Sequence, residues 1–154
     1  QDMRRLAAWA VSHPGEPILL DRFGEGPLPR GFVPGWLWSN TPGVRLAPLG
    51  AGTYVVSATE LSGVYTTLFR DAAWQQPQRL ATYRKLARLT ALPAVALPPG
   101  LSAEQLAQAH RDFDLLRRAR LIRELRGREP DERIGGSLFV YHLAQRDVDA
   151  LTAP

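Results

Sequence analysis

The carboxylates that could act as a general acid and a general base are scattered along the chain. Asp112 and Asp114 lie two residues apart in a segment with helical periodicity, so their side chains point to different sides of that helix. Asp21 and Glu60 each fall towards the end of a predicted strand, and they could approach one another if those strands are neighbours. The sequence therefore leaves one acid–base pair open and requires none.

The residue types and their spacing give little indication of a metal site, a cysteine nucleophile or a phosphate-binding loop. The three histidines, His13, His110 and His142, show no spacing typical of a metal site. The absence of cysteine excludes thiolate zinc sites, disulfides and cysteine nucleophiles. Gly50-Ala51-Gly52 lacks a third glycine and precedes a strand, whereas a phosphate-binding loop precedes a helix. We therefore expect no metal and no cofactor.

Arginine is the most conspicuous charged residue. The chain has 19 basic residues, all arginine except Lys85, and a formal net charge of +4. Seven of the arginines gather in and just after one predicted helix: Arg111, Arg117, Arg118, Arg120, Arg123, Arg126 and Arg128. They form either a solvated helix face, balanced by neighbouring carboxylates, or a surface for anionic lipid or phosphate. Nucleic acid is disfavoured, because the one aromatic residue of this helix, Phe113, lies on its apolar stripe and not among the arginines.

Tryptophans cluster in the stretch FVPGWLW, residues 32–38. Trp36 and Trp38 follow Pro34 and Gly35, which interrupt regular structure, so we interpret the stretch as a loop. Tryptophans on such a loop are typical of an anchor at a membrane interface. The alternative, that they close one end of the core, stays equally open.

Three segments have the periodicity of helices. The first is Asp2–His13, with apolar residues at i, i+3 and i+4 spacing. A second helix begins near Pro77, a residue that the first turn tolerates. The third and longest begins after Ser102, which forms a capping box with Gln105, and ends near Gly127.

Four segments have the character of strands. They are Pro17–Phe23, Val44–Leu49, Thr53–Leu61 and Arg133–Leu143. Thr53–Leu61 is the best candidate for a central strand, and Gly135-Gly136 lies near the entry of the last. Because strands alternate with helices, we predict an α/β or α+β fold. It should contain a small mixed sheet of four to five strands, with helices covering at least one face.

Length and composition indicate one globular domain, residues 1–154. Hydrophobic residues make up 45% of the chain, enough for a core without disulfides or metals. No stretch approaches the roughly 18 consecutive apolar residues of a membrane span, so we expect a soluble domain. The chain begins at Gln1, with Met3 as its first methionine, and we expect it to be a piece of a longer protein.

Three stretches carry a resemblance to a known family. They are Gln1-Asp2 before the first helix, GTYVVSATELSGVY at 52–65, and EPDERIGGSLFVYHL at 129–143. Together they resemble the soluble C-terminal domain of bacterial membrane glycosyltransferases of the protein-mannosyltransferase type. In that family a Trp-Gly-Gln-Asp motif precedes the helix. A Gly-x-Tyr-x-x-Ser strand is followed by Gly-Val-Tyr, and an Arg-Ile-Gly-x-Ser-x-x-Val-Tyr strand closes the domain.

The chain departs from the family pattern in three respects. Arg22 stands where a tyrosine is usual before Phe23-Gly24, and the paired tyrosines that normally follow are missing. Gly136 stands where a tyrosine is common. If the loop at Gly136 contacts a substrate in the family, that role does not carry over directly.

The resemblance implies a function and a location. Those enzymes take sugar from a polyprenyl-phosphate donor, and their catalysis is attributed to acidic residues on loops between membrane spans. The chain would then be a non-catalytic accessory domain on the extracytoplasmic face of the bacterial cytoplasmic membrane, C-terminal to the last span of a polytopic protein. It would position the acceptor or shape the mouth of the active site.

The candidate contacts with substrate or with the membrane-spanning part are Arg22, Trp36, Trp38 and Glu60. The partners would be the membrane-spanning part of the same polypeptide, lipid headgroups, and a glycan or protein acceptor. The alternative function is a carbohydrate- or protein-binding module without an enzymatic parent. A small nucleic-acid-binding protein is a third and weaker possibility.

Overall fold

The computed structural model describes residues 2–13, 18–21, 32–36 and 49–154. Five strands lie in one sheet: β1 (Ile18–Asp21), β2 (Phe32–Trp36), β3 (Gly52–Ser57), β4 (Glu132–Ile134) and β5 (Leu138–Leu143). The α-helices are α1 (Asp2–Val11), α2 (Ala58–Ser62), α3 (Asp71–Trp74), α4 (Pro77–Thr90), α5 (Ala103–Leu125) and α6 (Gln145–Leu151). Short 3-10 turns occupy η1 (Thr67–Phe69) and η2 (Ala94–Ala96).

The sheet is mixed, with strand order β2-β1-β3-β5-β4. Strand β1 pairs in parallel with β2 and β3, and β5 pairs antiparallel with β3 and β4. The class predicted from the sequence, an α/β fold around a mixed sheet of four to five strands, is confirmed.

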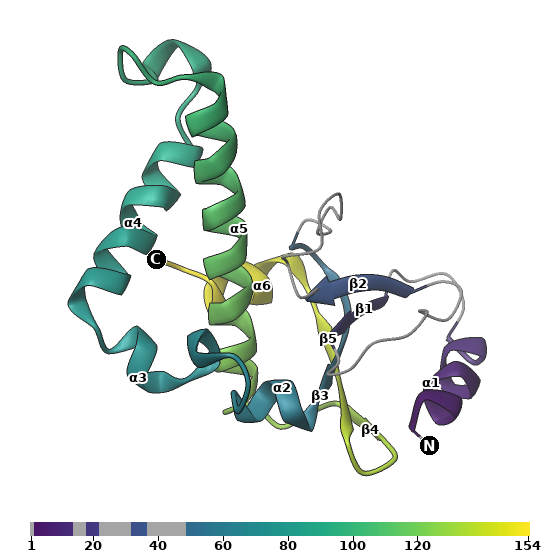
Figure 1. The fold of residues 1–154 in the computed structure, drawn as a ribbon. Helices are drawn as coiled ribbons and strands as arrows, with labels where there is room; N and C mark the ends of the chain where they lie inside the picture. The colour runs from purple at the N-terminus through teal and green to yellow at the C-terminus, as the bar shows by residue number, and fades with distance from the viewer. Residues whose placement is uncertain (1, 14–17, 22–31, 37–48) are drawn as a thin grey trace.

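Both faces of the sheet are covered, because successive residues of a strand point to opposite sides. Tyr54 and Val56 of β3 belong to a core shared with α2 to α6, whereas Val55 between them belongs to a core shared with α1. Figure 1 shows α1 alone beside one side of the sheet and the other helices on the opposite side. The molecule is therefore layered helix, sheet, helices, and helix cover on at least one face is confirmed.

Helices α4 and α5 form a long hairpin that projects from the sheet (Figure 1). Their aromatic side chains hold the base of the hairpin together. The ring centroids of Tyr83 and Phe113 lie 5.4 Å apart, and Trp74 meets Tyr83 edge-on at 5.5 Å. The Tyr83 hydroxyl donates to the carbonyl of Thr152 after α6, so the C-terminal segment braces the hairpin.

Two expectations about strand extent are wrong. Residues Thr53–Leu61 do not form one strand, because Ser57 accepts a hydrogen bond from the Glu60 amide and starts α2. Residues Arg133–Leu143 form a hairpin of β4 and β5, because Gly135 adopts a left-handed φ of 63° and reverses the chain.

The interpretation of residues 32–38 as a loop is wrong for Phe32–Trp36, which forms β2. An edge strand tolerates proline, since one of its sides has no ladder partner. Pro34 pairs with Leu20, and the register shifts before Trp36 pairs with Asp21. Trp38 and almost all of the predicted strand Val44–Leu49 lie outside the described residues.

Candidate functional site

The three stretches that carry the family resemblance meet at one end of the sheet. Ser137, in the β4–β5 turn, donates its hydroxyl to Asp2 Oδ2, in the first turn of α1. The same serine accepts a hydrogen bond of 2.7 Å from the Ala58 amide, where β3 passes into α2. One residue thus joins the beginning, middle and end of the pattern.

Gly135 allows this junction to close. A Cβ atom built on Gly135 would lie 2.3 Å from Oδ1 of Asp2, and its left-handed φ is unfavourable for any side chain. A Cβ atom on Gly136 would meet nothing within 4 Å. A side chain is therefore disfavoured at Gly135 and sterically tolerated at Gly136.

The polar residues of the pattern are used by the fold itself. The Tyr54 hydroxyl donates 2.6 Å to the carbonyl of Gly50, and the Tyr141 hydroxyl donates 3.2 Å to that of Leu125. Gly63 ends α2 with a left-handed φ of 65°. The hydroxyls of Tyr54 and Tyr141 therefore hold backbone segments in place within the fold.

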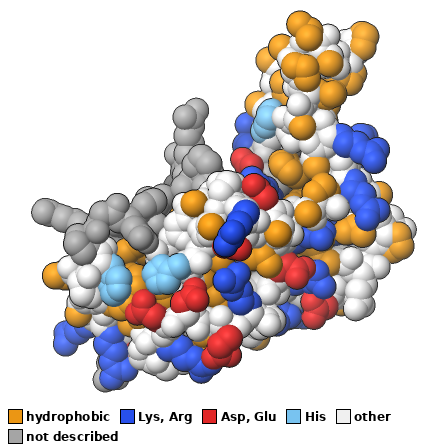
Figure 2. Space-filling view, turned by 180° about the vertical axis from the view of Figure 1, so that it is seen from behind, with side chains coloured by type: hydrophobic (Ala, Val, Ile, Leu, Met, Phe, Trp, Pro, Cys, Tyr) orange, Lys and Arg blue, Asp and Glu red, His pale blue; other side chains and the backbone are white. Residues whose placement is uncertain are grey.

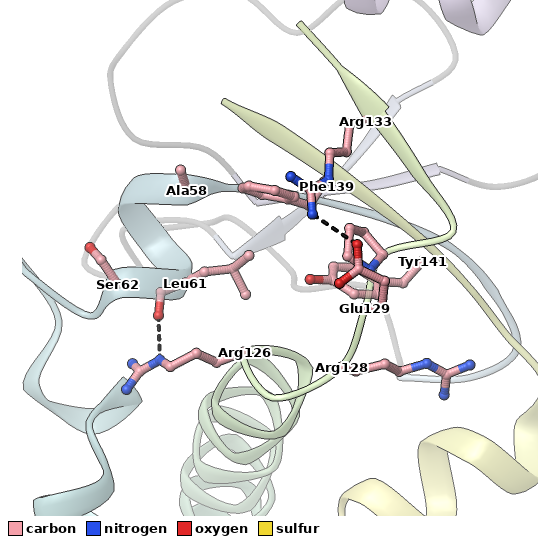
Figure 3. Close-up of a pocket in the computed structure, with 10 residues that line it drawn as sticks. Ala58, Leu61, Ser62, Arg126, Arg128, Glu129, Arg133, Phe139 and Tyr141 are labelled. Carbon is pink, nitrogen blue, oxygen red and sulfur yellow. Dashed lines mark hydrogen bonds and ion pairs between the residues drawn. The ribbon is translucent and has the colours of Figure 1, made fainter. Parts of the chain in front are cut away.

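A pocket of about 380 Å³ opens beside the junction (Figure 3). Helix α2 and the β4–β5 hairpin form its walls, and the end of α5 with the segment after it forms its base. Its charged lining consists of Arg126, Arg128, Arg133 and Glu129. The excess of arginine over carboxylate makes the pocket suited to an anionic group.

Two of the three arginines are engaged inside the protein. Arg126 donates 2.6 Å from Nε to the Leu61 carbonyl and 2.6 Å from Nη2 to the Phe69 carbonyl. Arg133 Nη2 lies 2.8 Å from Oε1 of Glu129. The guanidinium carbon of Arg133 lies 5.4 Å from the ring centroid of Phe139. The side chain of Arg128 makes no hydrogen bond or ion pair with another described residue. Arg128 is thus the side chain most available to an anion.

Glu60 is the one sequence-predicted site residue whose side chain the structure describes. It is 3% exposed, in the first turn of α2, and it does not line the pocket. Burial raises the pKa of Glu60 above its ordinary value of 4.5. Arg22 and Trp38 lie outside the described residues, and for Trp36 only its backbone place in β2 is described. The structure therefore does not bring the four predicted residues together into one site.

The acid–base pair that the sequence left open is only partly placed. Strands β1 and β3 are neighbours, and Asp21 pairs in register with Val56. Glu60, however, lies on α2 and not on a strand. Among the described residues, no group of three or more histidine, aspartate or glutamate side chains could hold a metal ion.

A cluster around Glu132 was not predicted from the sequence. The Trp9 indole donates 2.8 Å to Oε2 of Glu132, and Nε2 of His142 lies 3.3 Å from Oε1. These hydrogen bonds, that from Trp9 foremost, lower the pKa of Glu132 despite some desolvation. The cluster fastens α1 to the sheet edge at β4, and no local spacing signals it, because the partners are far apart in sequence.

From the sequence alone, the arginines of α5 are interpreted either as a solvated helix face or as a surface for anions. Several of them are instead partly buried against other parts of the protein. Arg118 is 3% exposed. The guanidinium carbon of Arg120 lies 5.7 Å from the Trp74 ring and 5.5 Å from the Tyr83 ring. Arg117 pairs with Asp149 of α6 at 3.0 Å, and Arg123 pairs with Asp71 of α3 at 2.8 Å. These side chains fasten the other helices to α5.

No family model, no curated protein and no solved structure matches this chain. None of the described helices combines the length and the apolar composition that a bilayer crossing requires.

Proposed function

We propose that this chain is a non-catalytic accessory domain of a membrane-bound glycosyltransferase that takes sugar from a polyprenyl-phosphate donor. The domain lies on the extracytoplasmic face of the bacterial cytoplasmic membrane. It positions the acceptor or shapes the mouth of the active site, and its closest partner is the membrane-spanning part of the same polypeptide.

The convergence of the three resembling stretches carries this proposal. Asp2 and Ser137 are 135 positions apart, yet they share a hydrogen bond, and Ala58 donates to the same serine. A chance likeness of three short stretches has no reason to place their polar residues against each other. A shared fold does, because one junction needs all three segments.

The geometry supports an accessory rather than a catalytic role. The polar residues of the pattern, including Tyr54, Ser57 and Tyr141, make hydrogen bonds within the domain. Among the described residues, the lining of the pocket beside the junction contributes three arginines and one carboxylate, Glu129, which is paired with Arg133. Such a lining can bind an anionic group, and the part of it that the structure describes holds no opposed pair of carboxylates for general acid and base catalysis.

Fractionation of the source cells tests the proposal. An antibody raised against this domain should detect a band much larger than 17.1 kDa, confined to membranes. A band near 17.1 kDa in the soluble fraction would contradict the proposal. A second assay compares sugar transfer from a polyprenyl-phosphate donor by membranes carrying Gly135→Ala with those carrying Gly136→Ala. We expect the first variant alone to lose transfer, because only the first disturbs the junction with Asp2.

One observation favours the alternative of a binding module without an enzymatic parent. The pocket is of a size that suits a small ligand, and it combines Arg128 with the aromatic residues Phe139 and Tyr141. The same immunoblot separates the two functions, since a free binding module gives the small soluble band.

A further inference from the structure

The end of the α4–α5 hairpin is apolar and exposed. We call residues 91–101 the tip; they comprise alanine, leucine, proline, valine and glycine only, without a charged or polar side chain. Val95 is 97% exposed and Leu92 is 40% exposed. Figure 2 shows hydrophobic side chains gathered at this end of the molecule. A large apolar surface at a protruding end usually marks a binding surface.

The core stops short of the tip. Along α4 the buried residue is Tyr83, and along α5 the buried residue nearest the N-terminus is Ala109. Beyond them the two helices carry only half-buried and exposed side chains. The tip therefore gives little to the core, and its apolar composition calls for another explanation.

Most backbone amides of the tip are either absent or already hydrogen-bonded. Pro93, Pro98 and Pro99 have no amide hydrogen. The amides of Leu92, Ala96, Leu97 and Leu101 donate to nearby carbonyls, with donor–acceptor distances of 2.8–3.4 Å. Few donors remain to be desolvated, which lowers the cost of entering an apolar phase.

Basic residues flank the tip. Arg84, Lys85 and Arg88 are exposed on the last turns of α4, and Arg111 is exposed on α5; we call these four the collar. Between residues 72 and 111, Glu104 is the one acidic residue. Blue side chains flank the apolar end in Figure 2. An apolar end behind a cationic rim is complementary to a bilayer with an anionic surface.

We infer that the tip inserts into the headgroup region of an anionic lipid bilayer, with the collar contacting lipid phosphates. Apolar side chains and prolines enter the interface, while the collar stays at the level of the negative charges. The inference rests on the helical hairpin alone and stands or falls separately from the proposed glycosyltransferase parent.

A second copy of the chain is a poorer occupant of the tip. Tip-to-tip contact would bring two collars of like charge together, which opposes association. A bilayer of anionic lipid satisfies both the apolar tip and the collar at once.

Vesicle binding tests the inference on the 154-residue chain. Vesicles contain phosphatidylglycerol and phosphatidylcholine in equal parts, or phosphatidylcholine alone, and bound protein is measured by co-sedimentation. We expect binding to the anionic vesicles and its decrease with added salt. Leu92→Asp with Val95→Asp should lower partitioning by roughly tenfold or more, because charge at the tip opposes insertion. Val64→Asp, at another exposed valine outside the hairpin, is the control and should bind like the parent chain.

A fluorescent probe reports insertion directly. Because the chain has no cysteine, Val95→Cys provides a single attachment point for a polarity-sensitive dye. Anionic vesicles should shift its emission to the blue, and Arg84→Gln with Arg88→Gln should weaken that shift. Absent binding, or binding that the tip variant does not reduce, would overturn the inference. Tip-dependent self-association in sedimentation without vesicles would overturn it in favour of a second copy.

Discussion

Ser137 donates a hydrogen bond of 2.5 Å to Asp2, although the two residues are 135 positions apart. The bond joins the first turn of α1 to the β4–β5 turn, beside the point where β3 becomes α2. The start of α1 and the β4–β5 turn thereby become neighbours, and the start of α2 lies against them through Ala58. One residue therefore ties together three segments that are far apart in the sequence.

The first prediction compares the two adjacent glycines of the β4–β5 turn. Gly135→Ala should lower the free energy of unfolding by about 2 kcal/mol, because it adds a clash with Asp2 to a left-handed φ. Gly136→Ala, or Gly136→Tyr, should change it by less than about 0.5 kcal/mol, since the added Cβ meets open space. Urea denaturation measures both. Equal losses for the two alanine variants would contradict the close approach of Asp2.

The second prediction concerns the Asp2–Ser137 bond itself. A double-mutant cycle with Asp2→Ala and Ser137→Ala should give a coupling energy of about 1 kcal/mol, since the bond involves a charged acceptor and is partly buried. Thermal denaturation of the four proteins provides the measurement. Additive effects of the two substitutions would show that the bond contributes nothing to stability.

The third prediction concerns Arg126, whose guanidinium satisfies two backbone carbonyls. Arg126→Gln should cost about 1–2 kcal/mol, because the carbonyls of Leu61 and Phe69 lose a charged donor at a partly solvated site. Arg128→Gln, two residues further on, is the matched control and should be close to neutral. If the control costs as much as Arg126→Gln, loss of positive charge and not of the two bonds is responsible.

The fourth prediction concerns the pH dependence that Glu60 imposes. Its pKa is raised above 4.5 by burial, so the folded state holds this proton to higher pH than the unfolded state does. The stabilising effect of the protonated group is complete below pH 4.5 and is lost as pH rises through the folded pKa. Glu60→Gln should therefore be more stable than the parent near neutral pH, and the advantage should vanish below the ordinary pKa. A stability difference independent of pH would exclude titration of Glu60 as its cause.

The fifth prediction concerns Glu132. Trp9→Phe should raise the pKa of Glu132 towards its ordinary value, because the indole hydrogen bond is the largest cause of its lowering. His142→Gln should have a smaller effect, since that contact is longer, at 3.3 Å. An NMR titration of the Glu132 side-chain carboxyl measures its pKa in both variants. An unchanged pKa in Trp9→Phe would mean that the indole does not donate to this carboxylate in solution.

Local signals in the sequence determined much of the secondary structure. Pro77 begins α4, and Ser102 with Gln105 forms the capping box of α5, as predicted. Both signals act within one helical turn, so neighbouring residues suffice to specify them. The alternation of helices and strands likewise specified the class of the fold.

Only the tertiary structure decided how these segments meet. The hydrophobic pattern of residues 133–143 is that of one strand, and the close packing of Gly135 on Asp2 accompanies the turn that divides it in two. The carbonyl contacts of Arg126 and the junction at Ser137 likewise depend on contacts that are distant in sequence, whereas the end of β3 at Ser57 is a local N-cap that competes with the strand propensity of the same residues. Each joins groups that are distant in sequence or competes with a local propensity of similar size, so the burial and hydrogen bonding of the assembled chain decide the outcome.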